Sequence, residues 1–291
     1  ILISKLPIGA KQVNALRRED YTAFADARLS GKYEGLRAIT PATLNGDIMG
    51  IRSVLKQAKL AWGLDVNLNE FEDAALGLKH SRKVSASIKR TRTPTSDELQ
   101  ELTTYFYAKW MAGKTTYPMH LIIWLAIYTA RRQEELTRLR IDDFNDGWWL
   151  VRNAKNPRGS MGNHINTKVR DNALPIIDAL KANKVRATMR RGNKHWDDEL
   201  LLPLSPKNIS AMFTRACKLK GIDDLRYHDL RHEAATRLAE QRLTVPEMQQ
   251  VTGHDSWSSL QRYVNVTPRK SILEFDRAMQ VAMLAWQDGR Y

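Results

Sequence analysis

The stretch HDLRHEAATRLAEQRLTVPEMQQVTGHDSWSSLQRY, residues 228–263, is the most informative part of this chain. It contains His228, Arg231, His254 and Tyr263, and of these four only Tyr263 carries a hydroxyl that can act as a nucleophile. A phenol stays protonated at neutral pH and is a weak nucleophile. Cationic neighbours help such a group when it attacks a centre whose negative charge grows in the transition state. The stretch therefore indicates an anionic target such as a phosphodiester.

The first five residues of the stretch also fit a second chemistry. His228 and His232 are four residues apart, like the two histidines of the HExxH zinc motif. Here Asp229 replaces the longer glutamate of that motif, and Arg231 would place a fixed positive charge beside a metal dication. A helix whose histidines only pack and cap is a third interpretation. The five residues alone leave these interpretations open, and we expect no metal.

An arginine and a glutamate follow an apolar segment in the middle of the chain. The sequence YTARRQEEL, residues 128–136, places Arg132 three residues before Glu135. A buried arginine needs an anionic partner, and Glu135 can orient the guanidinium so that its fork meets a phosphate. Arg132 and Arg231 would then hold both non-bridging oxygens of one phosphate without a metal. A surface ion pair between Arg132 and Glu135 is the alternative.

The composition favours a polyanionic partner. The chain has 291 residues, a formal net charge of +14 and a pI near 9.9. Such an excess suits nucleic acid because each phosphate contact releases counterions, although a basic protein without this role stays open. The single Cys217 cannot form an internal disulfide, which is typical of a reducing cytoplasm. The apolar run 121–130 is too short to span a membrane, and we find no signal peptide, so we expect a cytoplasmic protein without a membrane partner.

Residues 1–80 are expected to form a small helical module. Thr40-Pro41 is typical of a helix start, and apolar residues spaced by threes and fours follow it from Leu44 to Trp62. Residues 81–93 contain five lysines and arginines and no acidic residue, which indicates a basic linker, either lying along a phosphate backbone or merely solvated. We expect DNA contacts from the linker and from one later loop, through Arg82, Lys83, Lys89, Arg90, Arg92 and Arg158.

The second domain is expected to begin at residue 94 and to be mainly helical with a small antiparallel β element. Two β-prone runs, 148–151 and 169–176, flank a polar loop. The last helix is expected to begin at a capping box formed by Ser271 and Glu274, and it carries an apolar stripe.

The order of these residues resembles that of the tyrosine recombinases, the phage-type integrases. Their pattern is Arg-x-x-Glu, a lysine in a β-hairpin, His-x-x-Arg, Gly-His and then Tyr. This chain matches it at Arg132 with Glu135, at His228-Asp-Leu-Arg231-His232, at Gly253-His254, and at Tyr263 after eight intervening residues. The resemblance covers about 94–270 and implies a mixed α/β catalytic domain, while 1–80 look like the family's helical core-binding domain. Ala130 departs from the pattern, since a glycine is common at that place.

The resemblance also implies a role for each matched residue. Tyr263 would attack the scissile phosphate and form a 3′-phosphotyrosyl link, leaving a free 5′-hydroxyl. Arg132 and Arg231 would bind the phosphate oxygens. His228 and His254 would donate hydrogen bonds and help to move the tyrosine proton.

A lysine of the hairpin would protonate the leaving 5′-oxygen. We favour Lys155, which ends the run WWLVRNAK, over Lys168, which we expect to begin the return strand. Glu135 and Asp229 would support the catalytic groups. No cofactor is expected, because the covalent ester retains the energy of the cleaved bond, so that a second 5′-hydroxyl can reverse the step without ATP.

The expected partners are double-stranded DNA with specific recombination sites, further copies of the chain in a tetramer on DNA, and accessory DNA-bending proteins in the nucleoid of a bacterial or phage-infected cell. The two domains would clamp duplex DNA, and residues 271–291 would dock either on a neighbouring subunit or in cis. Two other functions stay open. One is a strand-passing enzyme such as a type IB topoisomerase or telomere resolvase, and the other is a DNA-binding regulator that no longer cleaves. A complete set of six catalytic residues argues against the regulator.

Overall fold

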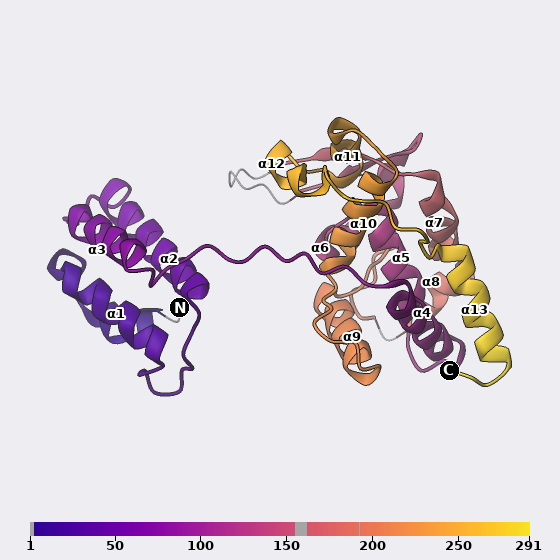
Figure 1. The fold of residues 1–291 in the computed structure, drawn as a ribbon, viewed down its shortest axis with the longest axis horizontal. Coiled ribbons are helices and arrows are strands. Elements are labelled where there is room, and N and C mark those ends of the chain that lie inside the picture. The colour runs from indigo at the N-terminus through magenta and orange to yellow at the C-terminus, as the bar shows by residue number, and fades with distance from the viewer. Residues whose placement is uncertain (1–2, 155–161, 192) are drawn as a thin grey trace. The chain divides into compact units, whose positions relative to one another are not determined.

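The computed structural model of the protein describes residues 3–154, 162–191 and 193–291 (Figure 1). Contacts along the chain divide it into two compact units, Ile1–Arg90 and Thr91–Tyr291. The described residues form mostly helices and one three-stranded antiparallel sheet, which confirms the expected fold class. No described helix has both the length and the apolar character needed to cross a membrane.

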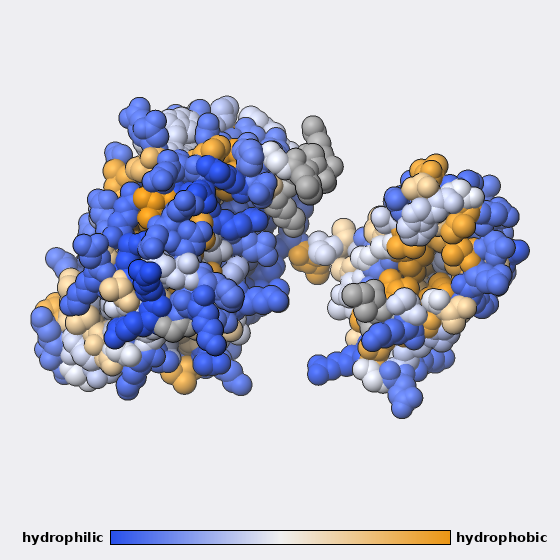
Figure 2. Space-filling model, turned by 180° about the vertical axis from the view of Figure 1, so that it is seen from behind, coloured by the Kyte–Doolittle hydropathy of each residue, from blue (hydrophilic) through white to orange (hydrophobic). Residues whose placement is uncertain are grey.

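The first unit is built from three helices, α1 (Arg18–Ser30), α2 (Pro41–Leu60) and α3 (Leu68–His80), preceded by three short 3-10 turns. The Thr40 hydroxyl accepts a hydrogen bond from the Thr43 N–H at 3.3 Å, which caps α2 as the sequence predicts. One face of α2 is buried against α1 and α3, through Leu44, Ile48, Ile51, Leu55 and Ala58. Trp62, which the sequence placed on the same face, lies beyond the helix end and is 62% exposed. On the face that Figure 2 shows, apolar side chains gather in a patch on this unit.

Residues 85–95 form neither helix nor strand, and order resumes at α4 (Ser96–Met111). Thr95 and Glu98 make the capping box that begins α4, with backbone-to-side-chain hydrogen bonds of 3.1 and 2.8 Å. Within the second unit α5 (Met119–Thr129) is buried along its whole length, because its residues are apolar on every side. Helices α4, α7 (Leu174–Lys181) and α10 (Asp229–Glu240) pack around α5. The remaining helices are α6 (Gln133–Leu136), α8 (Asn183–Arg190), α9 (Pro206–Leu219), α11 (Val245–Thr252), α12 (Trp257–Leu260) and α13 (Phe275–Gln287).

The sheet consists of β1 (Phe144–Asn145), β2 (Trp148–Val151) and β3 (Ile165–Lys168) in the order β1-β2-β3. The register pairs Val151 with Ile165 and Trp148 with Lys168. The expected strand at 169–176 is therefore wrong: β3 lies earlier, and 174–181 form α7. The polar run INTK makes a strand because β3 is an edge strand whose alternate side chains face solvent.

The C-terminal helix begins later than expected. The capping box of Ser271 and Glu274 is absent, because Glu274 is itself the N-cap and its side chain does not cap the helix. Its carboxylate instead accepts a hydrogen bond from the Tyr128 hydroxyl at 2.5 Å. Helix α13 packs on α4 of its own chain, with Ala278 and Ala282 buried, so that the structure records cis docking.

An ionic cluster ties the segment before α13 to α10. The Arg269 guanidinium contacts Glu233 at 2.9 Å and Glu240 at 2.7 Å, and Arg237 contacts Glu233 at 2.7 Å. The Glu233 and Glu240 side chains are almost completely buried, while that of Arg269 is one-third exposed. Hydrogen bonds to two carboxylates raise the pKa of Arg269 despite its partial burial. We refer to Glu233, Arg237, Glu240 and Arg269 as the α10 clasp.

Candidate functional site

A left-handed turn after α5 sets the position of the arginines. Ala130 has a φ of +54°, a conformation that costs a residue with a Cβ more than it costs glycine, and it stands where the recombinase pattern commonly has glycine. The Ala130 carbonyl accepts a hydrogen bond from Arg231 Nη1, so this turn also joins α10 to the end of α5. Arg131 and Arg132 follow the turn directly and precede α6.

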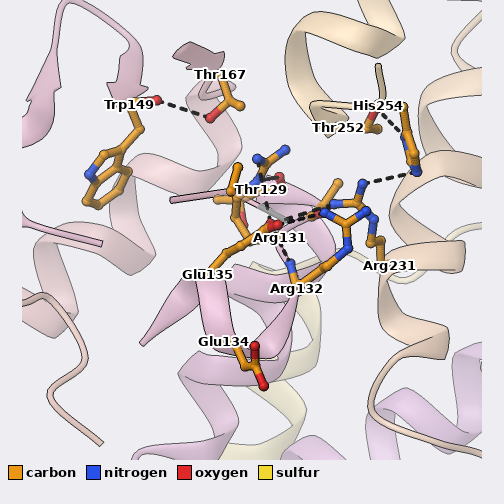
Figure 3. Close-up of polar contacts among 12 residues, drawn as sticks. Thr129, Arg131, Arg132, Glu134, Glu135, Trp149, Thr167, Arg231, Thr252 and His254 are labelled. Atoms are coloured by element: carbon orange, nitrogen blue, oxygen red, sulfur yellow. Dashed lines mark hydrogen bonds and ion pairs between the residues drawn. The ribbon is translucent and has the colours of Figure 1, made fainter. Parts of the chain in front are cut away.

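One buried carboxylate lies among three guanidiniums (Figure 3). Glu135 Oε1 is 2.7 Å from Arg132 Nη1, and Glu135 Oε2 is 3.9 Å from Arg131 Nη1 and 4.0 Å from Arg231 Nη1. Burial would raise the pKa of Glu135, but the nearby guanidiniums of Arg131 and Arg132 outweigh burial and lower it. One negative charge against three positive charges leaves an excess that suits a bound anion. We call these four residues the arginine cluster.

The three arginines differ in how open they are. The side chains of Arg131 and Arg231 are 1% and 5% exposed, whereas that of Arg132 is 30% exposed. Burial lowers the pKa of Arg131 to about 10 and that of Arg231 to about 9, so both stay charged at neutral pH. Arg131 Nη1 is buried and has no hydrogen-bond partner among the described residues. Arg132 therefore lies on the solvent side of the cluster, whereas Arg131 lies in the protein interior next to Glu135.

The hydrogen bonds of His254 define its protonation. Arginine only donates, so the 3.0 Å contact makes Arg231 Nη2 the donor and His254 Nε2 the acceptor. The ring proton then lies on Nδ1 and is donated to the Thr252 hydroxyl at 2.8 Å, which in turn donates to the Met248 carbonyl at 2.8 Å. Burial, followed by the charge of Arg231, lowers the pKa of His254 to about 3. In this state His254 is neutral, and its free electron pair is used by Arg231.

The Gly-His turn fits tightly against the arginine cluster. Gly253 ends α11 with a φ of +63°. A Cβ at this position would lie 2.6 Å from Ile165 Cδ1 and 3.1 Å from Arg131 Nη1. Glycine suits this left-handed backbone, and a side chain here would also require the ends of the Ile165 and Arg131 side chains to shift.

Tyr263 is nearly buried, at 7% exposure, in the short 3-10 turn Gln261–Tyr263. Its hydroxyl lies 2.7 Å from His232 Nδ1, and burial raises the pKa of the phenol. His228 packs edge-on against the His232 ring, with centroids 5.4 Å apart. The HDLRH motif predicted His232 as a zinc ligand or as a histidine that packs within a helix, and assigned it no catalytic role. Its place directly after Arg231 was the available signal that it belongs to the site.

Lys155, the expected hairpin lysine, and Arg158 lie outside the described residues. Lys168 ends β3 rather than beginning it, and it pairs with Trp148, at the opposite end of the β2–β3 pairing from Val151 and Ile165. Side chains alternate along a strand, so Lys168 faces away from the side on which Ile165 approaches Gly253. Lys168 instead lines a pocket together with Glu247 of α11.

The remaining predicted residues are dispersed. Asp229 is buried in the first turn of α10, where its carboxylate accepts a hydrogen bond from the Arg226 N–H at 2.9 Å. Of the basic linker residues, Lys83 pairs with Asp26 at 2.5 Å, and Arg92 pairs with Glu98. The others lie on exposed or half-exposed chain, at Arg82, Lys89 and Arg90.

Comparisons of the sequence relate the chain to known recombinases and integrases. Residues 93–270 match the model of the phage integrase family. The chain is 26% identical to the shufflon-specific DNA recombinase of Escherichia coli over 98% of its own length and 67% of that protein. It is 29% identical to the putative prophage phiRv2 integrase of Mycobacterium tuberculosis (strain CDC 1551 / Oshkosh) over 60% of its own length, and spans only 48% of that relative.

Solved structures show the same fold. The Tn1549 transposon integrase in complex with circular intermediate DNA superposes with a TM-score of 0.61 at 17% identity, covering 96% of this chain and 89% of that one. A lambda integrase (75-356) dimer bound to a COC′ core site superposes with a TM-score of 0.58 at 18% identity, covering 94% and 87%. Since the family model spans more than half of the sequence and contains the arginine cluster, the Gly-His turn and Tyr263, the chain belongs to the phage integrase family.

Proposed function

We propose that this protein is a site-specific DNA recombinase that cleaves and rejoins DNA through a 3′-phosphotyrosyl intermediate, without metal or ATP. The observation that carries the proposal is the arginine cluster, in which three guanidiniums share the one carboxylate of Glu135. Its Arg231 is directly followed on α10 by His232, which holds the hydroxyl of Tyr263. The net positive charge of the arginine cluster can bind a phosphate, and the buried phenol beside it can attack the phosphorus of a phosphodiester.

The chemistry is a transesterification. Arg132 and Arg231 bind the non-bridging oxygens of the scissile phosphate and stabilise the charge that develops on them. The Tyr263 oxygen forms a bond to phosphorus while the bond from phosphorus to the 5′-oxygen breaks. The leaving 5′-oxygen takes a proton, for which Lys155 is our proposed donor. Attack by a 5′-hydroxyl of a second strand reverses these changes and releases Tyr263.

The hydrogen bonds of His254 suggest how binding prepares the site. When Arg231 turns its Nη2 toward a phosphate oxygen, His254 Nε2 loses the donor that it has at 3.0 Å. The negative charge of the phosphate at the same time offsets the arginine charge that lowers the pKa of His254. His254 then takes up a proton and donates to the phosphate, which is the role expected from the family pattern.

Double-stranded DNA and further copies of the chain are the proposed partners. A lambda integrase tetramer bound to a Holliday junction has the same fold, with a TM-score of 0.57 at 18% identity. By analogy, four copies of this protein would assemble on two specific DNA sites. Residues 1–80 and the linker 81–93 would contact the DNA, and accessory DNA-bending proteins would assist. The assembly would form in the cytoplasm, at the nucleoid. Docking of 271–291 on a neighbouring subunit would first require α13 to leave α4.

A covalent trapping experiment tests the proposal. The protein first selects its core site from a randomised duplex library, and a nicked duplex carrying that site then serves as substrate. We expect a protein–DNA adduct that resists SDS and disappears in Tyr263→Phe. Tyr291→Phe, the same change at a 58% exposed tyrosine, is the control and retains the adduct. An adduct that persists in Tyr263→Phe refutes the assigned nucleophile.

The same substrates distinguish recombination from strand passage. Two intact copies of the selected site should yield a Holliday junction and then exchanged products. Relaxation of supercoiled plasmid without any junction would instead identify a type IB topoisomerase. Binding without cleavage by the wild type would identify a regulator.

A further inference from the structure

The hydroxyl of Tyr263 is held by His232, a residue to which the family pattern assigned no role. His232 Nδ1 lies 2.7 Å from the Tyr263 oxygen, and the two ring centroids are 6.5 Å apart. His232 follows Arg231 directly, so consecutive residues of α10 contact the nucleophile and belong to the arginine cluster. A rigid helix therefore fixes both positions relative to each other.

The direction of this hydrogen bond follows from what surrounds it. The Tyr263 hydroxyl is buried and must place its proton on an acceptor, and among the described residues His232 is its hydrogen-bond partner. The hydroxyl is thus the donor and Nδ1 the acceptor. Since a neutral imidazole carries one ring proton, that proton lies on Nε2 of His232.

The charged groups that face His232 keep its electron pair available. These are His228 at the N-cap of α10, Asp229 and Arg231 within α10, and Arg262 of the 3-10 turn; of these Asp229 favours the protonated ring and the others favour the neutral ring. Burial, followed by the charge of Arg262, lowers the pKa of His232 to about 4. The ring is therefore neutral at physiological pH and ready to accept.

We propose that His232 takes the proton of Tyr263 when the phenol attacks the scissile phosphate, and returns it when the ester is resolved. This inference rests on the proposed recombinase function. In the forward step the Tyr263 oxygen bonds to phosphorus, the bond to the 5′-oxygen breaks, and the phenolic proton moves to His232 Nδ1, which makes an imidazolium. In the reverse step the 5′-hydroxyl attacks, the Tyr263 oxygen leaves, and it recovers the proton from Nδ1.

Phosphate binding would make His232 a better base when it is needed. The charge of Arg231 is one of those that lower its pKa in the DNA-free protein. A phosphate on the arginine cluster offsets that charge, and the further negative charge of the transition state stabilises an imidazolium nearby. Proton transfer is thereby coupled to occupation of the site, so that Tyr263 remains a protonated and unreactive phenol in the absence of DNA.

The test separates proton transfer from positioning. In His232→Asn the amide oxygen can occupy the place of Nδ1 and accept the hydrogen bond, but it cannot take the proton. His195→Asn is the matched control, because His195 is exposed. Single-turnover cleavage of the nicked duplex is measured between pH 6 and pH 9, together with DNA affinity and thermal stability.

We expect His232→Asn to bind DNA like the wild type and to cleave about 10²–10⁴-fold more slowly, the usual contribution of general base catalysis. Its rate should rise with pH where the wild-type rate is level, because hydroxide replaces the missing base. Trifluorotyrosine at position 263 is a more acidic phenol. It should restore much of the cleavage rate of His232→Asn and change the wild-type rate little. A purely structural role of His232 would not respond to phenol acidity.

Three results would overturn the inference. One is a His232→Asn rate close to that of the wild type. Another is a slow His232→Asn rate that neither higher pH nor trifluorotyrosine restores. If His232→Asn does not fold, His232→Gln is measured in its place by the same criteria. The third concerns the DNA-free wild type: a ¹⁵N spectrum at pH 7 that shows the His232 proton on Nδ1 contradicts the direction of the hydrogen bond. A wild type that forms no adduct, by contrast, rejects the proposed function itself.

Discussion

Replacing Glu135 by glutamine is the most direct test of the arginine cluster. The Glu135 side chain is 2% exposed and faces guanidinium nitrogens at 2.7, 3.9 and 4.0 Å. At about 4 Å, two unit charges attract by about 4 kcal/mol when the effective dielectric constant is about 20. Glutamine has nearly the same shape, so the change removes the charge and leaves three guanidiniums without a counterion.

The expected loss of unfolding free energy is about 3–5 kcal/mol, the usual cost of breaking a buried ion pair. For a unit of about 200 residues this corresponds to a fall in melting temperature of roughly 6–20 °C. Thermal unfolding followed by circular dichroism measures it. Glu134→Gln is the control: Glu134 is exposed, Figure 3 shows it away from the cluster, and we expect a change within about 0.5 kcal/mol. Inorganic phosphate should stabilise Glu135→Gln more than the wild type, because it replaces the lost counterion.

The pH dependence gives a second check on the same variant. The pKa of Glu135 is lower in the folded protein than its ordinary value. A carboxylate of this kind stabilises the fold above its unfolded pKa, and the contribution is lost as the pH falls through the folded pKa. The stability difference between the wild type and Glu135→Gln should therefore be full at neutral pH and shrink on acidification. A difference that grows on acidification, or a Glu135→Gln that is as stable as Glu134→Gln, refutes the reasoning.

Two further substitutions probe the surroundings of the site. Gly253→Ala should destabilise the fold by about 1–2 kcal/mol because the backbone at this position is left-handed, while the end of the Ile165 side chain can shift away from the new Cβ at small cost. An unchanged melting temperature would contradict this. Arg269→Gln removes one of the cationic partners of buried Glu233 and should lower the free energy of unfolding by about 2 kcal/mol. This value is below the range for a fully buried pair because the Arg269 side chain is 33% exposed. Arg277→Gln, a change at an exposed arginine of α13, is its control, and equal melting temperatures of the two variants would show that the α10 clasp contributes nothing.

The sequence predicted those features that depend on local patterns. Thr40-Pro41 and the Thr95–Glu98 capping box begin helices as expected, because a cap needs only neighbouring residues. The spacing of Arg132 and Glu135 likewise predicted their contact, since three residues form one helical turn.

The expected strand at 169–176 is wrong for a local reason, because a 3-10 turn interrupts the run at Asp171 and Pro175 stands at the start of α7, which packs on α5. Features that depend on tertiary context were also missed. Glu274 looked like a capping glutamate, yet Tyr128, distant in sequence, binds its carboxylate. The role of His232 was hidden for the same reason, because only the folded chain places Tyr263 against it.

The α10 clasp also limits how far the nucleophile can travel. Arg269 is the sixth residue after Tyr263, so an extended segment between them reaches about 20 Å at ~3.3–3.6 Å per residue. While the clasp holds, a DNA end esterified to Tyr263 stays on a short tether anchored to the same helix that carries Arg231 and His232. Strands can then exchange only within the radius of that tether, and a broken end cannot drift away from the site that must reseal it.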